Sequence, residues 1–262
     1  MQIDITIDRH VHTHLCHHAV GTMEEYVLAA LERGLRGMVF LEHLELGIDY
    51  FESTWLSEAD FDAYWREGER LRLVYGHRIG IGLGVEVGYN PERLAELRSF
   101  LGRYPWERVG ISHHFLKIDG RHHNLLSRKR ENLAVFSRFG LKQVTDAYFQ
   151  GLLAAVEELP GSALCHLDAV LRHHPDARFD EEHGAMINAI LQALAAKGMA
   201  LEVNTSGFPM RGEPYPGPAI FKRAAELGIR LEAGSDAHRP GDVGRFFDRL
   251  GALAHGGGRE KR

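Results

Sequence analysis

The chain has 262 residues, of which 44% are hydrophobic and 26% charged, and its formal net charge is −5. These values are ordinary for a globular protein and exclude a disordered, collagen-like or coiled-coil chain. The acidic balance also argues against a dedicated nucleic-acid-binding protein. Two cysteines, a start without a secretory signal and the lack of an apolar stretch of about 18 residues predict a cytoplasmic protein with no membrane segment.

Short apolar runs alternate with longer amphipathic segments along the whole chain. The longer segments carry helix start and stop signals, most clearly after Thr22, where Glu25 can complete a capping box and Gly34 follows the last turn. Further helices are predicted to begin after Ser57, at Pro91, after Asp180 and at Pro218. The apolar runs are predicted to be strands at residues 3–7, 38–41, 79–85, 109–112, 163–165, 199–203 and 230–233.

This regular alternation predicts an α/β fold with a parallel sheet of βαβ units. We favour one barrel domain over residues 1–254, with one unit fewer than the usual eight, because polar residues end every strand; an open doubly wound sheet is the alternative. Residues 255–262 are predicted to form a flexible C-terminal tail. The segments 44–57 and 117–130 are expected to be long loops at the carboxyl face of the barrel, where lids usually lie.

Seventeen histidines are a high number, and many of them stand at the predicted strand ends. In a parallel barrel these ends converge on one face, where active sites assemble. Imidazoles and carboxylates together are typical ligands of divalent cations. The residues at the strand ends are, in chain order, Asp8, His10, His12, Glu42, His43, Glu86, His113, His114, His166, Asp168, Glu202, Asn204, Asp236 and His238.

The spacing of these residues sharpens the prediction. Residues two apart in a strand share a face, so His10 and His12 can bind one ion together, and Asp236 and His238 have the same spacing. A carboxylate such as Glu86 can bridge two ions. We therefore expect two or three divalent ions rather than one. Cys16 and Cys165 neighbour these positions but form no Cys-x-x-Cys motif, so we expect them to be small buried residues.

The strand-end residues resemble the PHP superfamily, named after polymerase and histidinol phosphatase. The similarity extends from Ile7 to about Gly244 and is greatest to the monofunctional histidinol phosphatases, through VNTSG at 203–207, Tyr215-Pro216 and SDAHRP at 235–240. The motifs shared with the superfamily are His10-Val11-His12-Thr13, His18, His43, Glu86 in GVEVG, His114 in SHH, His166-Leu167-Asp168 and GSDAH at 234–238.

The resemblance implies a distorted (β/α)7 TIM-like barrel that holds three metal ions (zinc, manganese or iron) at the carboxyl face of its strands. Glu42 stands where family members usually have aspartate. We interpret Glu42 as a residue behind the ligands, so this difference concerns fine adjustment of the metal site more than the presence of activity. The neighbouring histidines at 17–18 and 113–114 leave two ligands open to a shift by one residue. The implied ligand sets are His10, His12, Glu86 and Asp236 for the first ion, Glu86, His114 and His166 for the second, and His18, His43 and His238 for the third.

We expect a phosphomonoesterase in which metal ions generate the attacking hydroxide and hold the phosphoryl oxygens. The resemblance implies L-histidinol phosphate as the substrate, in histidine biosynthesis. The alternative is a phosphoesterase of the same superfamily acting on a nucleotide or another small phosphate ester. A non-enzymatic alternative is a metal-storing or regulatory barrel, or a proofreading module detached from a polymerase. A homo-oligomer is compatible with the sequence, which does not determine the oligomeric state.

Other residues are assigned by position. Asp168 and His238 are candidate proton donors to the leaving alkoxide. Histidines away from the strand ends, at 77, 183 and 255, are expected to be exposed. The candidate phosphate-binding residues, chosen because a transferring phosphoryl group needs cationic partners, are Arg172, Arg211 and Arg239.

Overall fold

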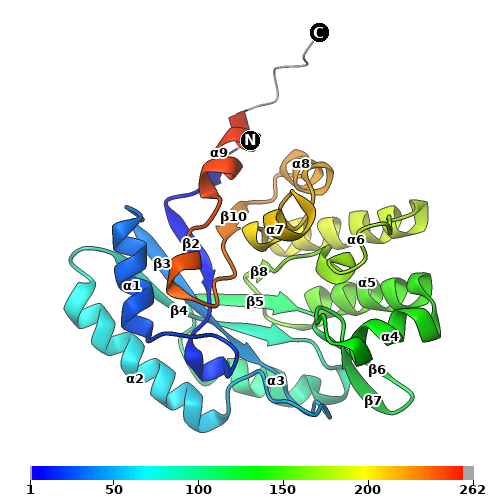
Figure 1. The fold of residues 1–262 in the computed structure, drawn as a ribbon, viewed down its shortest axis with the longest axis horizontal. Coiled ribbons are helices and arrows are strands. Elements are labelled where there is room, and N and C mark those ends of the chain that lie inside the picture. Colours follow the sequence, from blue (N-terminus) through cyan, green and yellow to red (C-terminus); the bar gives the residue numbers. More distant parts are fainter. Residues whose placement is uncertain (1, 256–262) are drawn as a thin grey trace.

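The structure, a computed structural model, describes residues 2–255. Figure 1 shows strands in the centre, with α1 and α2 on one side and α4, α5 and α6 on the other. The strands are β1 (Ile3–Asp4), β2 (Ile7–Val11), β3 (Gly37–Leu44), β4 (Gly80–Gly88), β5 (Arg108–Ser112), β6 (Phe115–Ile118), β7 (Arg121–Asn124), β8 (Ala163–Leu164), β9 (Ala200–Asn204) and β10 (Leu231–Gly234). The helices are α1 (Met23–Glu32), α2 (Glu58–Tyr75), α3 (Leu94–Leu101), α4 (Arg130–Phe139), α5 (Leu141–Glu158), α6 (Glu181–Lys197), α7 (Phe208–Arg211), α8 (Pro218–Glu226) and α9 (Phe247–His255).

The main sheet is parallel and closes on itself as a barrel. Its strand order is β1-β10-β9-β8-β5-β4-β3-β2. A bridge between Val11 and Ala237 joins the two ends, and the His12 amide donates a hydrogen bond to the Ala237 carbonyl oxygen at 2.9 Å. The predicted α/β barrel is thereby confirmed, and the open sheet is excluded. Because the strands are parallel, their carboxyl ends meet at one face.

The first predicted strand was wrong in its position. Residues 3–7 do not form one strand, because Asp4 accepts hydrogen bonds from the amide and the hydroxyl of Thr6, at 3.0 and 2.6 Å, and turns the chain there. The barrel strand β2 starts at Ile7, where the predicted strand was to end. As a result, His10 lies within β2, and its side chain is fully buried in the barrel.

The segment 117–130 was predicted as a loop, but part of it belongs to a hairpin. Strands β6 and β7 pair antiparallel, and Asp119 and Gly120 connect them with φ angles of 50° and 80°. An Asp-Gly pair is a strong hairpin signal, because both residues tolerate positive φ. The other predicted loop, 44–57, holds no helix or strand between β3 and α2, as expected.

The predicted helix starts are confirmed where capping residues mark them. Thr22 with Glu25 and Ser57 with Asp60 form capping boxes at α1 and α2. His183 was predicted to be exposed but is buried, because its Nδ1 accepts the Asp180 amide hydrogen at the start of α6. His77 is exposed as predicted. The prediction for the side chain of His255, and that of a flexible tail at 256–262, lie outside the described residues.

The helices pack on the outside of the barrel through buried apolar and aromatic side chains. Tyr64 of α2 is fully buried, and its hydroxyl lies 3.0 Å from the Phe40 carbonyl oxygen of β3 and 2.9 Å from that of Gly84 in β4. These contacts fix α2 across two neighbouring strands. Among the described residues, no helix is both long and apolar enough to cross a membrane.

Candidate metal centre

Glu86, at the end of β4, is the centre of a cluster of imidazoles. Its Oε1 lies 2.8 Å from His166 Nε2 and 3.2 Å from His114 Nε2. Its Oε2 lies 3.0 Å from His43 Nδ1 and 3.4 Å from His10 Nε2. The carboxylate is fully buried and comes from the strand in the middle of the group. One carboxylate therefore faces histidines from four other chain segments.

A second part of the cluster lies around Asp236, after β10. His12 Nε2 is 3.3 Å from Asp236 Oδ1 and 2.9 Å from His10 Nε2. His10 and His12 thus share a face of β2 and its extension, as their spacing predicted. His10 also reaches Asp236, with 3.9 Å between its Nε2 and Oδ1.

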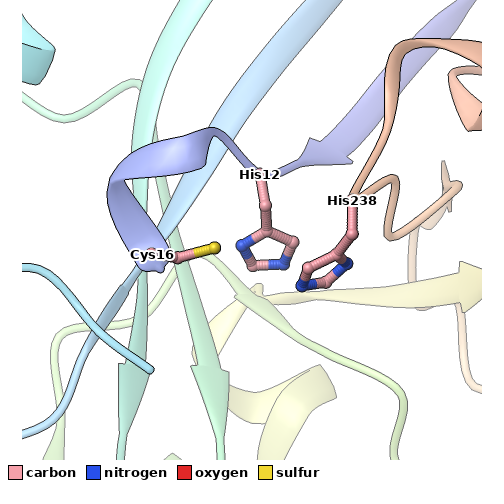
Figure 2. A group of neighbouring side chains, drawn as sticks. All are labelled: His12, Cys16 and His238. Carbon is pink, nitrogen blue, oxygen red and sulfur yellow. The ribbon is translucent and has the colours of Figure 1, made fainter. Parts of the chain in front are cut away.

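The third part of the cluster consists of His18, His43 and His238, whose ligand atoms all lie within 4.8 Å of one another. Figure 2 shows His238 beside His12, with the sulfur of Cys16 on the other side of the His12 ring. Burial raises the pKa of the Cys16 thiol above its usual range. Both cysteines are buried, as predicted. All residues of the predicted ligand sets are therefore brought together at one face of the barrel.

The two pairs of adjacent histidines point in different directions. His18 joins the cluster, whereas His17 is exposed and its Nδ1 lies 3.3 Å from the Ser53 carbonyl oxygen. His114 faces Glu86, whereas the His113 Nδ1 donates to the Tyr148 carbonyl oxygen at 3.2 Å. Burial lowers the pKa of His113 to about 4, so this ring is neutral. The geometry thus favours His18 and His114 over their neighbours.

The backbone at two predicted ligands is strained. His166 has a φ of 24° and Asp236 a φ of 53°, a region that residues with a side chain rarely adopt. Such strain persists only where the surrounding structure holds it, and it is concentrated at functional sites. Both residues turn the chain directly after a barrel strand and aim their side chains at the cluster.

The donor set fits divalent cations. Glu86 Oε2 and His238 Nε2 are buried and have no hydrogen-bond partner among the described residues. The Nε2 atoms of His10 and His12 lie 2.9 Å apart, so the lone pairs of both rings can be directed at one cation. Imidazole and carboxylate ligands suit zinc, iron and manganese. Zinc and related divalent ions therefore match the chemistry of this cluster.

Opposite charges are concentrated in the cluster. Burial alone would raise the pKa of Glu86, but His114, His10 and His43 outweigh it and hold that pKa well below its usual range. Burial opposes protonation of His114, yet Glu86 and Glu45 raise its pKa to about 10. The pKa of His43 is lowered by burial and by His12. These imidazoles therefore favour the ionised form of the Glu86 carboxylate.

A cavity of about 480 Å³ opens onto the cluster, and His43, Glu86, His114, His166 and Asp236 form part of its lining. Of the three predicted phosphate-binding arginines, Arg172 lines the cavity. The guanidinium carbons of Arg172 and Arg211 both lie 5.7 Å from the centre of the Tyr215 ring. The two arginines are therefore neighbours on one aromatic side chain.

Arg239 lies elsewhere. Its side chain is 71% exposed, pairs with Asp242 at 3.8 Å, and is not among the residues that line the cavity. The sequence offered it as a further cationic partner for a phosphoryl group. It directly precedes a 3-10 turn at Pro240–Asp242. Its phosphate contact stays a prediction, which the position of this exposed side chain does not support.

Both predicted proton donors have other partners. Asp168 is buried, and its Oδ2 accepts the Gly217 amide hydrogen at 3.0 Å and lies 3.6 Å from an Arg211 nitrogen. Burial raises the pKa of Asp168 to about 6. His238 Nδ1 donates to the Asp236 carbonyl oxygen at 3.1 Å, which leaves Nε2 for the cluster.

Several further residues that the structure places at the site belong to none of the ligand sets or phosphate-binding residues predicted from the sequence. Glu45 Oε1 accepts the His114 Nδ1 hydrogen at 2.8 Å, and Glu202 Oε1 accepts that of His10 at 2.6 Å. Tyr50, Phe115 and Lys129 line the cavity. All five residues of β9 are buried, so a carboxylate in its sequence ALEVN is the signal that could have pointed to Glu202, whereas the loops carry no periodic pattern. Their positions depend on contacts far apart in the sequence.

Two proteins of known name are similar to this chain over nearly its whole length. A protein of Deinococcus radiodurans called "Probable histidinol-phosphatase" is 31% identical over 256 residues, covering 96% of this chain and 94% of that protein. The "Histidinol-phosphatase" of Bacillus subtilis is 28% identical, covering 92% of this chain and 96% of that protein.

A solved structure has the same fold. Histidinol phosphate phosphatase from Lactococcus lactis, complexed with zinc, L-histidinol and phosphate, matches with a TM-score of 0.81 and 22% identity, over 97% of this chain and 94% of that chain. The family model described as "PHP domain" matches residues 8–206, which include the cluster residues from His10 to His166. This chain belongs to the PHP domain family.

Proposed function

We propose that this chain is a metal-dependent phosphomonoesterase that hydrolyses L-histidinol phosphate to L-histidinol and phosphate. The observation that carries the proposal is the buried carboxylate of Glu86 with imidazole nitrogens of four histidines within 3.4 Å. The full-length similarity to proteins called histidinol-phosphatase supports the choice of substrate. The zinc, L-histidinol and phosphate of the Lactococcus lactis complex are the ligands that this choice implies.

Three divalent ions, with zinc, manganese or iron as candidates, fit the three parts of the cluster. Bound cations of this kind lower the pKa of water and neutralise charge on phosphoryl oxygens. Glu86 is common to two of the sets and keeps its negative charge between them. The sets that would hold the ions are His10, His12, Glu86 and Asp236, then Glu86, His114 and His166, then His18, His43 and His238.

Arg172 and Arg211 bind the phosphate group. Nε of Arg172 and one terminal nitrogen of Arg211 are buried and lack a hydrogen-bond partner among the described residues, so both have donors to offer. Guanidinium groups form short, charge-assisted hydrogen bonds with phosphate oxygens. Both guanidinium carbons lie 5.7 Å from the centre of the Tyr215 ring, which supports the two groups. Asp168 holds Arg211 in place rather than donating a proton, since its Oδ2 faces that arginine and the Gly217 amide.

The leaving group lies against the aromatic wall of the cavity. Tyr50 and Phe115 line it, with their ring centres 5.1 Å apart in an edge-to-face arrangement. Such rings pack well against a flat aromatic group such as imidazole. Glu52 forms an ion pair with Lys129 at the mouth, so the two long segments after β3 and β5 meet there. Both residues of this pair line the cavity.

The test is an assay of the metal-loaded protein on a panel of phosphate monoesters. L-Histidinol phosphate is compared with nucleoside 5′-monophosphates and hexose phosphates, and kcat/KM is measured for each. We expect L-histidinol phosphate to give the highest value by at least about tenfold, a difference of about 1.4 kcal/mol in transition-state binding. Comparable or faster turnover of a nucleotide would contradict the substrate. No turnover of any ester with zinc, manganese or iron would contradict the function.

A further inference from the structure

Glu202, on β9, is fully buried beside the metal centre but belongs to none of its ligand sets. Its Oε1 accepts the His10 Nδ1 hydrogen at 2.6 Å. Its Oε2 accepts the backbone amide hydrogen of His166 at 2.9 Å and a side-chain amide hydrogen of Asn204 at 3.1 Å. One carboxylate thus joins β2, β9 and the turn after β8.

The occupied oxygens distinguish Glu202 from a metal ligand. Each of its two oxygens already accepts a hydrogen bond from the chain. Glu86, by contrast, has a buried Oε2 without a hydrogen-bond partner among the described residues. A carboxylate whose lone pairs are used in this way acts through the groups that it holds. Outer carboxylates of this kind fix the ring orientation and tautomer of histidine ligands.

The contact with His10 fixes which nitrogen of that ring carries the hydrogen. Because the carboxylate accepts from Nδ1, the neutral ring has its lone pair on Nε2. That Nε2 lies 3.4 Å from Glu86 Oε2 and 2.9 Å from His12 Nε2, inside the cluster. Without an acceptor at Nδ1 the ring could take the other tautomer, which has no lone pair to offer there.

The contact with His166 acts on the backbone. His166 has a φ of 24°, and its amide hydrogen points at Glu202 Oε2. The hydrogen bond offsets part of the cost of this strained backbone conformation. The same conformation places His166 Nε2 2.8 Å from Glu86 Oε1.

The neighbouring strand leaves room for this arrangement. A Cβ atom on Gly234 of β10 would overlap the Glu202 carboxylate and would lie 2.8 Å from the Cβ of His10. Glycine at this position therefore permits the close approach of β9 and β2 side chains. Its φ is not in the left-handed region, so its use is spatial.

We propose that Glu202 is a positioning residue for the metal centre: it sets the tautomer of His10 and the backbone of His166, so that both rings present Nε2 to the cations. The inference rests on the proposed metal-dependent function. It gives a role to Glu202, the carboxylate of β9, which belongs to none of the three ligand sets.

Glu202→Gln tests this proposal, with Glu232→Gln as its matched control. A glutamine can accept through only one atom, so it cannot hold both His10 and His166. Glu232 pairs with Glu202 in the sheet register, is also buried, and forms ion pairs with Arg108 and Arg230 instead of a cluster histidine. Both variants thus alter a buried barrel carboxylate in the same layer.

The readout is zinc affinity, measured by competition with a chelator and elemental analysis of the protein, alongside thermal unfolding of the metal-free form. We expect Glu202→Gln to bind zinc about 10–100-fold more weakly than the wild type. Glu232→Gln should unfold at a lower temperature and keep the wild-type affinity. Glu202→Asp retains the charge but is one methylene shorter, so it should also weaken binding.

The outcomes separate the two proposals. If the wild type binds none of zinc, manganese and iron, the metal-dependent function fails and Glu202 has nothing to position. If the wild type binds zinc and Glu202→Gln binds it equally tightly, only the role of Glu202 is overturned. An equal loss of affinity in Glu232→Gln overturns it as well, because the effect would then be general destabilisation. If Glu202→Gln does not fold, Glu202→Asp is measured in its place with the same two outcomes.

Discussion

His166 Nε2 lies 2.8 Å from Glu86 Oε1, although 80 positions separate the two residues in the chain. The barrel produces this contact by placing β4 and the turn after β8 at the same face, with β5 between them. The histidines of the cluster arrive in the same way, from strand ends and the segments after them, with His10, His12 and His18 all coming from β2 and the segment that follows it. The fold therefore surrounds one buried carboxylate with imidazoles. Burying a charge away from water is costly unless it is paired, and these imidazoles supply the pairing.

Glu86→Gln should remove the charge that the imidazoles surround. The amide has no negative charge to share between two sets of ligands. We expect loss of bound metal and a fall in kcat/KM of more than about 100-fold, beyond the range seen for residues that only orient ligands. Bound metal is measured by elemental analysis and activity on L-histidinol phosphate.

The control for this variant is Glu92→Gln. Glu92 follows the same strand, but its side chain is 54% exposed and pairs with Lys117. Exposed ion pairs contribute about 0–1 kcal/mol, so this variant should keep its metal and its activity. Retention of full metal content and activity in Glu86→Gln would contradict the assignment of Glu86 as the central ligand.

Removal of metal should lower the thermal stability of the protein as well as its activity. A ligand that binds only the folded state stabilises it by about 2.7 kcal/mol at 100 times its Kd. The metal-free cluster also leaves buried charges close together. We expect a lower Tm after treatment with a chelator, and recovery of both Tm and activity when zinc or manganese is returned. If the Tm does not change when the protein loses its metal, the result would contradict the expectation that bound metal stabilises the folded barrel.

Local signals in the sequence were sufficient for the barrel and for the cluster. Strand ends are marked by short apolar runs followed by polar residues, and parallel strands bring their ends together whatever the loops do. This is why His43, Glu86 and Asp236 could be placed at one face without coordinates. His10 and His12 are two residues apart, and this spacing also predicted that their side chains lie on the same side of the strand.

Features that depend on contacts between distant segments escaped the sequence. Asp4 turns the chain through its own side chain, and this moved the first barrel strand away from the apolar run. Arg239 was a candidate because a phosphoryl group needs cationic partners, yet its side chain is 71% exposed and is not among the residues that line the cavity. Glu202 and Glu45 are visible in the sequence as carboxylates. That they accept hydrogen bonds from His10 and His114 follows only from the structure. Beyond the end of a strand, the distance between two residues in the sequence does not predict where their side chains point.

Arg172 and Arg239 should differ sharply when each is replaced by alanine. Arg172 lines the cavity and has a buried donor to offer, whereas Arg239 is largely exposed. A hydrogen bond to a charged group contributes about 1.5–3 kcal/mol, so Arg172→Ala should lose roughly 10–100-fold in kcat/KM. Arg239→Ala should match the wild type. Steady-state kinetics and inhibition by inorganic phosphate measure the difference, and similar losses in both variants would contradict the placement of the phosphate.

Asp168→Asn separates positioning of Arg211 from proton donation. The asparagine can still accept the Gly217 amide hydrogen through its oxygen, but it no longer attracts the guanidinium 3.6 Å away. If Asp168 only holds Arg211, the variant should raise KM and weaken inhibition by phosphate about tenfold, as expected for one charge-assisted contact, while kcat falls little.

The double variant completes this test. Because the two residues act through one contact, adding Asp168→Asn to Arg211→Ala should cost little beyond Arg211→Ala alone. A proton donor would behave otherwise: kcat would fall by about 100-fold or more in Asp168→Asn, whether or not Arg211 is present, because general acid catalysis contributes about 10²–10⁴-fold. If the losses of kcat in the two single variants add up in the double variant, Asp168 acts independently of Arg211, and the result would favour Asp168 as a proton donor.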